Sequence, residues 1–301
     1  MPLKNQLHVD QLLSQISVKY MNSDYIADKI FPTVSVRKDS DLFRIYDRDF
    51  GIPDTQRANK GVANQWYFEV STASYILQDH AIKDYISDDD IDNYDIADLR
   101  ADTVEELTDV IMRQQERTVC DLFTTTNWSL NVSLAAANAW NLSTQVSNPI
   151  PIVDTGATEI LENSGQKANY MVLNREAFTA VKNHTSVLDR TKYTTAAMTE
   201  EIMAGLFDVP EFMVSTAVRD ESQKGVGPSI TAMWGDVAFL GYKPARPGPK
   251  APSAGYIFRK DVPMVRRWRD EERNAEAIEV RNKYQARIVA SLSGFLIKDV
   301  I

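Results

Sequence analysis

The sequence predicts a mixed α+β protein that carries a long, exposed hairpin arm. Three patterns indicate this: one long amphipathic helix in the first half, a long alternating strand near the C-terminus, and an arm too polar to bury itself. The chain has 301 residues, enough for one large or two modest domains. Its hydrophobic content of 44% is ordinary for a chain that buries a core.

The arm spans residues 41–77. Alternating apolar residues predict an outgoing and a returning strand: Phe43 and Ile45, then Trp66, Phe68 and Val70. The connection between them, residues 47–64, is almost without apolar runs, although loops longer than about 12–15 residues are uncommon in compact domains. An isolated hairpin is marginal in water. The arm therefore either lies loosely on a monomer or, as we favour, packs on a neighbouring subunit.

The strongest helical pattern follows an acidic run at residues 88–95. Its apolar residues lie three or four apart or at compatible multiples: Ile96, Leu99, Val104, Leu107, Val110, Ile111, Val119 and Leu122. Acidic residues at a helix start complement its dipole, so we interpret the run as a helix cap. A weak cation site is the alternative, but a calcium loop would need glycine at Asn93 and glutamate at Leu99. The helix is expected to reach about thirty residues, well above the average.

The middle of the chain, residues 150–255, has an α/β pattern. We expect helices at 158–163, ended by Gly165, at 175–181, capped by Asn174, and at 199–206. Short buried strands are expected at 170–173, 212–214 and 238–240. Four prolines make residues 243–252 a stiff loop.

The C-terminal part is predicted to be β-structure. Apolar residues alternate with polar ones from Ile278 to Ile288, which is longer than the usual strand. The preceding run, residues 256–269, is expected to pair with it across a polar tip at 270–276, with Pro263 at a sheet edge. Residues 288–301 are apolar enough to be buried.

The N-terminal residues 7–36 are predicted to form a short helix, from the helical spacing of Leu12, Leu13, Ile16 and Tyr20, followed by an extended arm, because Pro32 breaks any helix. The first residues lack the apolar core of a signal peptide, and no stretch approaches the length of a membrane span. The single cysteine, Cys120, excludes an internal disulfide and fits a reducing compartment. We therefore expect folding in the cytoplasm.

No residue pattern indicates catalysis, so we predict no enzyme activity, no cofactor and no metal. The histidines His8, His80 and His184 lack metal-ligand spacing, and Cys120 falls on the apolar side of the long helix. Nucleotide-binding and nucleophile-elbow motifs are missing from the sequence. The net charge of −9 argues against a protein that grips nucleic acid over its whole surface.

Charged and aromatic residues at two places are predicted to contact other subunits. A basic run is balanced by acids in the C-terminal tip, and the arm offers three more candidates: Arg266, Arg267, Arg269, Glu271 and Glu272, with Arg57, Lys60 and Trp66. Because their charges balance, we interpret the tip residues as pairing across subunits. A local contact with DNA remains the alternative.

Several segments resemble one known family. Residues 25–36 (YIADKIFPTVSV), 164–174 (SGQKANYMVLN) and 184–190, and the stretch from Trp234 to Tyr242, resemble major capsid proteins of tailed bacteriophages. The order of the segments is also similar to the Hong Kong 97-type capsid fold. The resemblance covers essentially the whole chain.

This resemblance implies a division of the chain into regions: an N-terminal arm (1–40), an extended loop formed by a β-hairpin (41–77), a peripheral domain with a long spine helix (78–149), an axial α/β domain (150–255), the long β arm of the peripheral domain (256–290), and a C-terminal strand returning to the axial domain (291–301). Some relatives link a lysine of the extended loop covalently to an asparagine. At Lys60 we expect a charged contact and no such link.

The resemblance also implies partners and a location. The subunit would form pentamers and hexamers of an icosahedral head around double-stranded DNA, which it would contact weakly and non-specifically. A portal protein, a separate scaffolding protein and a decoration protein are the other implied partners, with no membrane involved. The head would be assembled in the host cytoplasm and would form part of the virion. The alternatives are an encapsulin-like shell protein of a bacterial nanocompartment and, from a different class, a monomeric enzyme or binding module.

Overall fold

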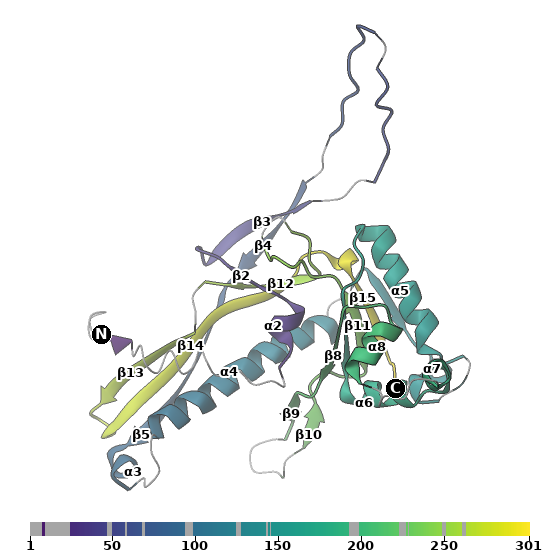
Figure 1. The fold of residues 1–301 in the computed structure, drawn as a ribbon. Helices are drawn as coiled ribbons and strands as arrows, with labels where there is room; N and C mark the ends of the chain where they lie inside the picture. The colour runs from purple at the N-terminus through teal and green to yellow at the C-terminus, as the bar shows by residue number, and fades with distance from the viewer. Residues whose placement is uncertain are drawn as a thin grey trace.

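The computed structural model describes residues 8–9, 25–46, 50–57, 59–67, 70–93, 99–124, 128–142, 144, 146–192, 199–222, 227, 229–248, 251–260 and 263–301. Two β-sheets form the body, a long helix crosses one of them, and a thin arm projects away from both (Figure 1). The α+β class predicted from the sequence is confirmed. The helix predicted from the spacing of Leu12, Leu13, Ile16 and Tyr20 lies outside the described residues.

The first sheet is built around one long strand near the C-terminus. Its strands are β1 (His8–Val9), β2 (Thr33–Ser35), β5 (Gln78–Ser87), β12 (Gly255–Arg259), β13 (Met264–Asp270) and β14 (Ala275–Ile288). Along one edge of β14, β13 and then β12 pair antiparallel, and β5 pairs along the other edge. The predicted alternation is confirmed, because Ile278, Val280 and Tyr284 are fully buried. Pro263 lies between β12 and β13 and not within an edge strand.

The long helix α4 (Leu99–Thr124, 26 residues) packs on this sheet. Its buried Val104, Leu107 and Ile111 form one apolar cluster with Val265, Ile278 and Val280. Residues 88–93 of the acidic run do not belong to α4 but form a separate short helix, α3 (Asp88–Asn93), whose Asp90 N–H donates to Ser87 Oγ. The interpretation as a helix cap therefore applies to α3.

The second sheet has five strands in the order β6 (Leu130–Ser133), β15 (Gly294–Lys298), β11 (Val237–Gly241), β7 (Tyr170–Asn174) and β8 (Glu211–Ser215). Helices α5 (Pro149–Ser164), α6 (Arg175–Asn183), α7 (Thr185–Thr191) and α8 (Glu200–Leu206) surround it, with short 3-10 turns η2 (Ala136–Asn138) and η3 (Trp140–Leu142). Figure 1 shows this layered unit beside the C-terminal end of α4. β6 pairs here although it precedes residue 150.

Local signals fix the helix ends around the second sheet. Asn174 Oδ1 accepts from the Ala177 N–H at 2.6 Å, and Gly165 ends α5 in the left-handed conformation with φ 64°. The start of α5 was predicted nine residues too late, at 158 instead of Pro149. Pro149 and Pro151 are tolerated there because N–H groups of a first helical turn have no intrahelical acceptor.

The two sheets share one core. Phe123 of α4 is fully buried, with its ring 5.4 Å from Phe31, 5.5 Å from Trp128, 5.1 Å from Trp234 and 4.6 Å from Phe239. The same cluster includes residues of both β7 and β14. The body is therefore one packing unit and not two domains on a linker.

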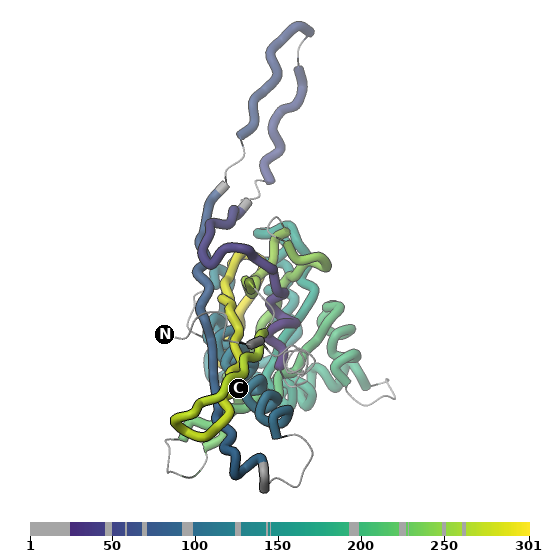
Figure 2. Tube along the Cα trace, turned by 90° about the vertical axis from the view of Figure 1, so that its left-hand side faces the viewer, coloured from purple at the N-terminus to yellow at the C-terminus, as the bar shows by residue number. Residues whose placement is uncertain are grey.

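The arm is a two-stranded ribbon at its base and extended chain beyond. Strands β3 (Ser40–Tyr46) and β4 (Val70–Ile76) pair, and Phe43 and Tyr75 pack on Phe258. Residues 50–57 and 61–67 carry no strand, so the returning strand begins at Val70 and not at Trp66. Figure 2 shows this part of the arm extending beyond both sheets.

Two small elements complete the described structure. Helix α2 (Ala27–Ile30) lies on α4, and a second hairpin, β9 (Val218–Asp220) with β10 (Ile230–Ala232), projects from the second sheet beside α4 (Figure 1).

Candidate assembly surfaces

The outer arm exposes large apolar side chains. Ile52 and Val62 are 97% and 91% exposed, and Phe50, Trp66 and Tyr67 are also exposed. Exposed apolar groups gathered on one element mark an interaction surface more often than isolated ones do. Trp66 is accessible, at 40% exposure, and its contact with another subunit stays a prediction.

The polar arm residues have different roles from one another. Arg57 Nε donates to the Gly61 carbonyl and Asn64 Nδ2 donates to the Asp54 carbonyl at 2.6 Å, so both hold the two sides of the arm together. Lys60 sits in the intervening turn with a positive φ of 63° and an exposed side chain. Of the two predicted contact residues, Lys60 is the more available to another molecule.

A charged anchor fixes the base of the arm. Asp39 accepts from Lys260 Nζ at 2.8 Å and from Lys283 Nζ at 2.7 Å. These hydrogen bonds lower the pKa of Asp39 to about 2. The Leu77 N–H donates to the Asp39 carbonyl at 2.8 Å, so both ends of the hairpin are tied to β12 and β14 at one point.

The basic residues of the C-terminal tip find partners within the chain. Arg269 donates hydrogen bonds to both carboxylate oxygens of Asp88, and Arg267 Nε lies 3.1 Å from Glu276 Oε1. Arg266 is half-buried, opposite Val9 in the β1–β13 pair. The structure thus brings Arg267 and Arg269 to acids of neighbouring elements that the sequence pattern did not identify.

The side chain of Glu271 is more exposed than those of Arg267 and Arg269. Glu271 has a largely exposed side chain 3.8 Å from Arg269 Nε, and the Glu272 N–H donates to Asp270 Oδ1 in the turn between β13 and β14. Glu271 and Glu272 therefore remain the predicted tip residues best placed to meet another molecule.

A buried carboxyl group escaped the sequence analysis. Glu116 of α4 is 0% exposed. Its Oε2 accepts from the Ile26 and Ala27 N–H groups at 3.0 and 2.7 Å, and its Oε1 accepts from Trp234 Nε1 at 2.6 Å. Burial raises the pKa of Glu116 despite these donors. The residue joins the N-terminal segment, the long helix and the connection between β10 and β11.

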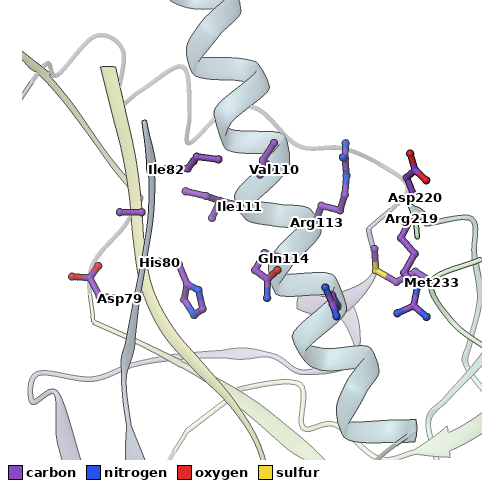
Figure 3. A pocket seen from close by; sticks show the side chains of 12 residues that line it. Asp79, His80, Ile82, Val110, Ile111, Arg113, Gln114, Arg219, Asp220 and Met233 are labelled. Carbon is purple, nitrogen blue, oxygen red and sulfur yellow. The ribbon is translucent and has the colours of Figure 1, made fainter. Parts of the chain in front are cut away.

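A groove of about 510 Å³ lies between β5, α4 and the β9–β10 hairpin (Figure 3). α4 crosses it, with Asp79 to Ile82 of β5 on one side and Arg219, Asp220 and Met233 on the other. Arg113, Gln114 and Arg117 project from α4 into it. No local pattern predicts this site, because Arg219 and Asp220 lie more than a hundred residues after the α4 residues that they face.

The residues considered for chemistry have structural surroundings. His184 Nδ1 accepts from the Ser186 N–H at the start of α7, and His80 stacks on Tyr284. Cys120 is buried and donates to the Met233 carbonyl, and burial raises the pKa of its thiol to about 12. In the described part of the chain, histidine, cysteine and acidic side chains form no cluster suited to a metal ion. No helix in that part is long and apolar enough to cross a membrane.

Comparison with solved structures defines the class of fold. The chain matches a crystal structure of a phage-related protein from Bordetella bronchiseptica RB50 with a TM-score of 0.78, at 23% identity and 98% coverage of both chains. It also matches the mature capsid of bacteriophage PhiM1 with a TM-score of 0.61, at 10% identity, over 93% of this chain and 88% of that one. The fold is the Hong Kong 97-type capsid fold, as the resemblance implied.

Comparison with curated proteins gives a more particular likeness. The chain is 24% identical over 306 aligned residues to the major capsid protein of Burkholderia phage BcepMu. The alignment covers 97% of this chain and 96% of the relative. No model of a protein family matches the chain.

Proposed function

We propose that this chain is the major capsid protein of a tailed bacteriophage, a structural subunit that assembles into the shell of the virion head. The observation that carries the proposal is the arm, whose Ile52 and Val62 are almost wholly exposed on a chain with a capsid fold. Fully exposed branched apolar side chains are unfavourable in water, and burial against a second copy would stabilise each of them by roughly 1.5–3 kcal/mol. The full-length likeness to a phage capsid protein supports the same function.

The details of assembly proposed here are those implied by the resemblance to capsid proteins of tailed phages. The subunits form pentamers and hexamers of an icosahedral head that encloses double-stranded DNA, with a portal protein, a separate scaffolding protein and a decoration protein as partners. The net charge of −9 supports weak and non-specific contact with the packaged DNA. Assembly takes place in the host cytoplasm.

The regions of the chain take the corresponding roles. The peripheral domain comprises residues 78–149 and 256–290 with α4 as its spine, and the axial domain comprises residues 150–255 with the C-terminal strand. Residues 41–77 lie across a neighbouring subunit, with Lys60 and Trp66 in contact with it. Glu271 and Glu272, beside Arg266, Arg267 and Arg269, meet their equivalents at the tip.

Deletion of residues 50–63 tests the role of the arm. The two ribbon strands and their anchor remain, so the variant should stay folded and soluble as a single subunit, slightly lighter than the 34.0 kDa of the full chain. It should fail to form the stable shells that the full chain forms in electron micrographs and in size-exclusion chromatography. Ile52→Ser should weaken assembly, because it removes an exposed apolar side chain. Gln56→Ser changes a polar residue of the same exposed segment and should not weaken assembly. Intact shells from the deletion would contradict the role of the arm.

Two other functions make different predictions. An encapsulin-like compartment would enclose a cargo protein, whereas a phage head gene lies beside genes for a portal and a DNA-packaging motor. A monomeric enzyme or binding module would stay at about 34 kDa under all conditions, without shells. The named relative favours the phage head over both.

A further inference from the structure

A titratable ring is buried where two helices of the second-sheet unit meet. Helices α6 and α7 join at a corner (Figure 1), and His184 is the residue between them. Its N–H donates to the Val181 carbonyl at 3.1 Å, and its carbonyl accepts from the Val187 and Leu188 N–H groups, both at 3.0 Å. The side chain of His184 is 0% exposed. The residue therefore ends α6, begins α7 and has no access to water.

Both ring nitrogens of His184 have partners that require a neutral ring. Nδ1 accepts from the Ser186 N–H at 3.2 Å, so it carries no proton, and the single proton of the neutral imidazole is on Nε2. Nε2 lies 3.1 Å from Ser147 Oγ. The Ser147 hydroxyl in turn donates to the Thr144 carbonyl at 3.0 Å and accepts from the Thr144 N–H at 2.8 Å. The neutral ring thus ties the α6–α7 corner to the chain that leads into α5.

A second proton on this ring would break the arrangement. Protonated Nδ1 is a donor, and it would face the Ser186 N–H, which is also a donor. The new charge would be buried, which is costly without a counter-charge. Burial lowers the pKa of His184 below its ordinary value, although the hydrogen bond to the Thr144 backbone acts in the opposite direction.

The surroundings of the ring supply no counter-charge. Residues 134–148 contain no titratable side chain. The charged residues of the surrounding helices are all exposed or half-buried: Arg175, Glu176 and Lys182 on α6, Asp189 and Arg190 on α7, Asp154, Glu159 and Glu162 on α5, and Glu200 and Glu201 on α8. Within the described residues, none of these groups hydrogen-bonds to the ring or forms an ion pair with it.

We propose that the α6–α7 corner is a pH-sensitive latch, closed at neutral pH while His184 is neutral and opened in mild acid when its ring takes up a proton. Opening frees the start of α7 from its cap and separates it from Ser147. It also uncovers Val187, which is fully buried in the same apolar cluster as Trp140 and Val181. The latch belongs to the single subunit, so it does not depend on the proposed function.

The sign of the pH dependence follows from the direction of the shift. The opened corner binds the proton with the ordinary histidine pKa of about 6.5, and the closed corner binds it less readily. The closed corner is therefore fully stable above about pH 6.5 and loses stability as the pH falls from there towards the lower pKa of the closed form.

Amide-resolved hydrogen exchange on the unassembled full-length chain tests the latch. The protection factor of the Ser186 amide should fall several-fold between pH 7.5 and pH 5. The largest possible fall is about thirtyfold, reached if only the opened corner takes up the proton. The Ala177 amide is the internal control, because Asn174 caps α6 through a side-chain oxygen that does not titrate. Its protection should stay constant, which separates local opening from general acid unfolding.

Two histidine variants complete the test. His184→Asn keeps a side-chain acceptor that suits the start of a helix but cannot titrate, so the pH effect at Ser186 should disappear. His80→Asn removes a histidine that stacks on Tyr284 in the first sheet, and the effect should remain. An NMR titration of the wild-type rings, with signals assigned through these variants, should give His184 a midpoint below 6.5. A midpoint at or above 6.5, unchanged protection of Ser186, or a pH effect that survives in His184→Asn would overturn the proposal.

Discussion

Glu116 shows how one side chain can hold three segments together. Its fully buried carboxyl group accepts hydrogen bonds from the backbone N–H groups of residues 26 and 27 and from the Trp234 indole. No cation among the described residues is paired with it. A buried carboxyl group is costly unless all its acceptor positions are used. Here the hydrogen bonds satisfy both oxygens, so the N-terminal segment is fixed to α4 by polar contacts as well as by Phe31.

Replacing Glu116 with glutamine should destabilise the protein although the shape is kept. The amide nitrogen would face either Trp234 Nε1 or the two backbone N–H groups, leaving donors opposed, at a cost of about 1–3 kcal/mol. Urea unfolding measures this change, and hydrogen exchange at Ala27 should accelerate. Glu105→Gln, an exposed site on the same helix, serves as the control. Equal stability of the two variants would contradict the role of Glu116.

Asp39 gives the arm a pH-dependent anchor. Its pKa in the folded protein is lowered to about 2, below the unfolded value of about 3.9, chiefly by the hydrogen bonds from Lys260 and Lys283. The contribution of this anchor is therefore complete above about pH 4 and is lost as the pH falls towards 2.

An NMR titration of the Asp39 carboxyl group should show a midpoint near 2. Asp39→Asn should speed hydrogen exchange of the Leu77 amide at neutral pH, because that amide donates to the residue 39 carbonyl. Asp54→Asn in the outer arm should leave the Leu77 amide unchanged. A midpoint for Asp39 at the ordinary value would show that the two lysines do not hold it.

Among the helices and strands, the sequence predicts those features that depend on interactions between residues close together in the chain. The alternation from Ile278 to Ile288 predicted most of β14, because each buried position there contacts a sheet neighbour. Asn174 and Gly165 predicted helix ends, because their roles depend only on adjacent backbone. The arm was found from its lack of apolar runs, a property that does not require knowledge of the fold.

Elements that depend on distant partners were missed. β5 is half-exposed and highly charged, and it is a strand because it has β14 to pair with, nearly two hundred residues later. Arg269 likewise pairs with Asp88, which lies 181 residues earlier in the chain. The groove could not be predicted for the same reason. The assembly surfaces could not be predicted because the residues that form them are far apart in the sequence.

At the scale of the whole molecule, the shared core makes the two sheets interdependent. The cluster around Phe123 includes rings from the N-terminal segment, from the chain after α4 and from β11. Neither sheet can lose its packing without exposing the other. We therefore expect the body to unfold as one cooperative unit.

Calorimetry of the unassembled chain should show a single transition, and Phe123→Ala should lower its midpoint without splitting it. Removing a fully buried phenylalanine costs about 3–5 kcal/mol. Leu161→Ala, at an exposed position on α5, should change stability by about 0.5 kcal/mol or less. Two separate transitions in the wild-type protein would refute the shared core.

The distribution of tryptophan gives the molecule an optical property. Trp128, Trp140 and Trp234 are fully buried, whereas Trp66 lies on the outer arm and is 40% exposed. The emission wavelength of an indole ring depends on the polarity around it, so the three buried rings provide a constant background, to which the partly buried Trp268 of β13 adds. Burial of the arm by another subunit would shift the emission maximum of Trp66 to a shorter wavelength. The unlabelled protein thus carries its own fluorescent reporter of the moment at which one subunit meets the next.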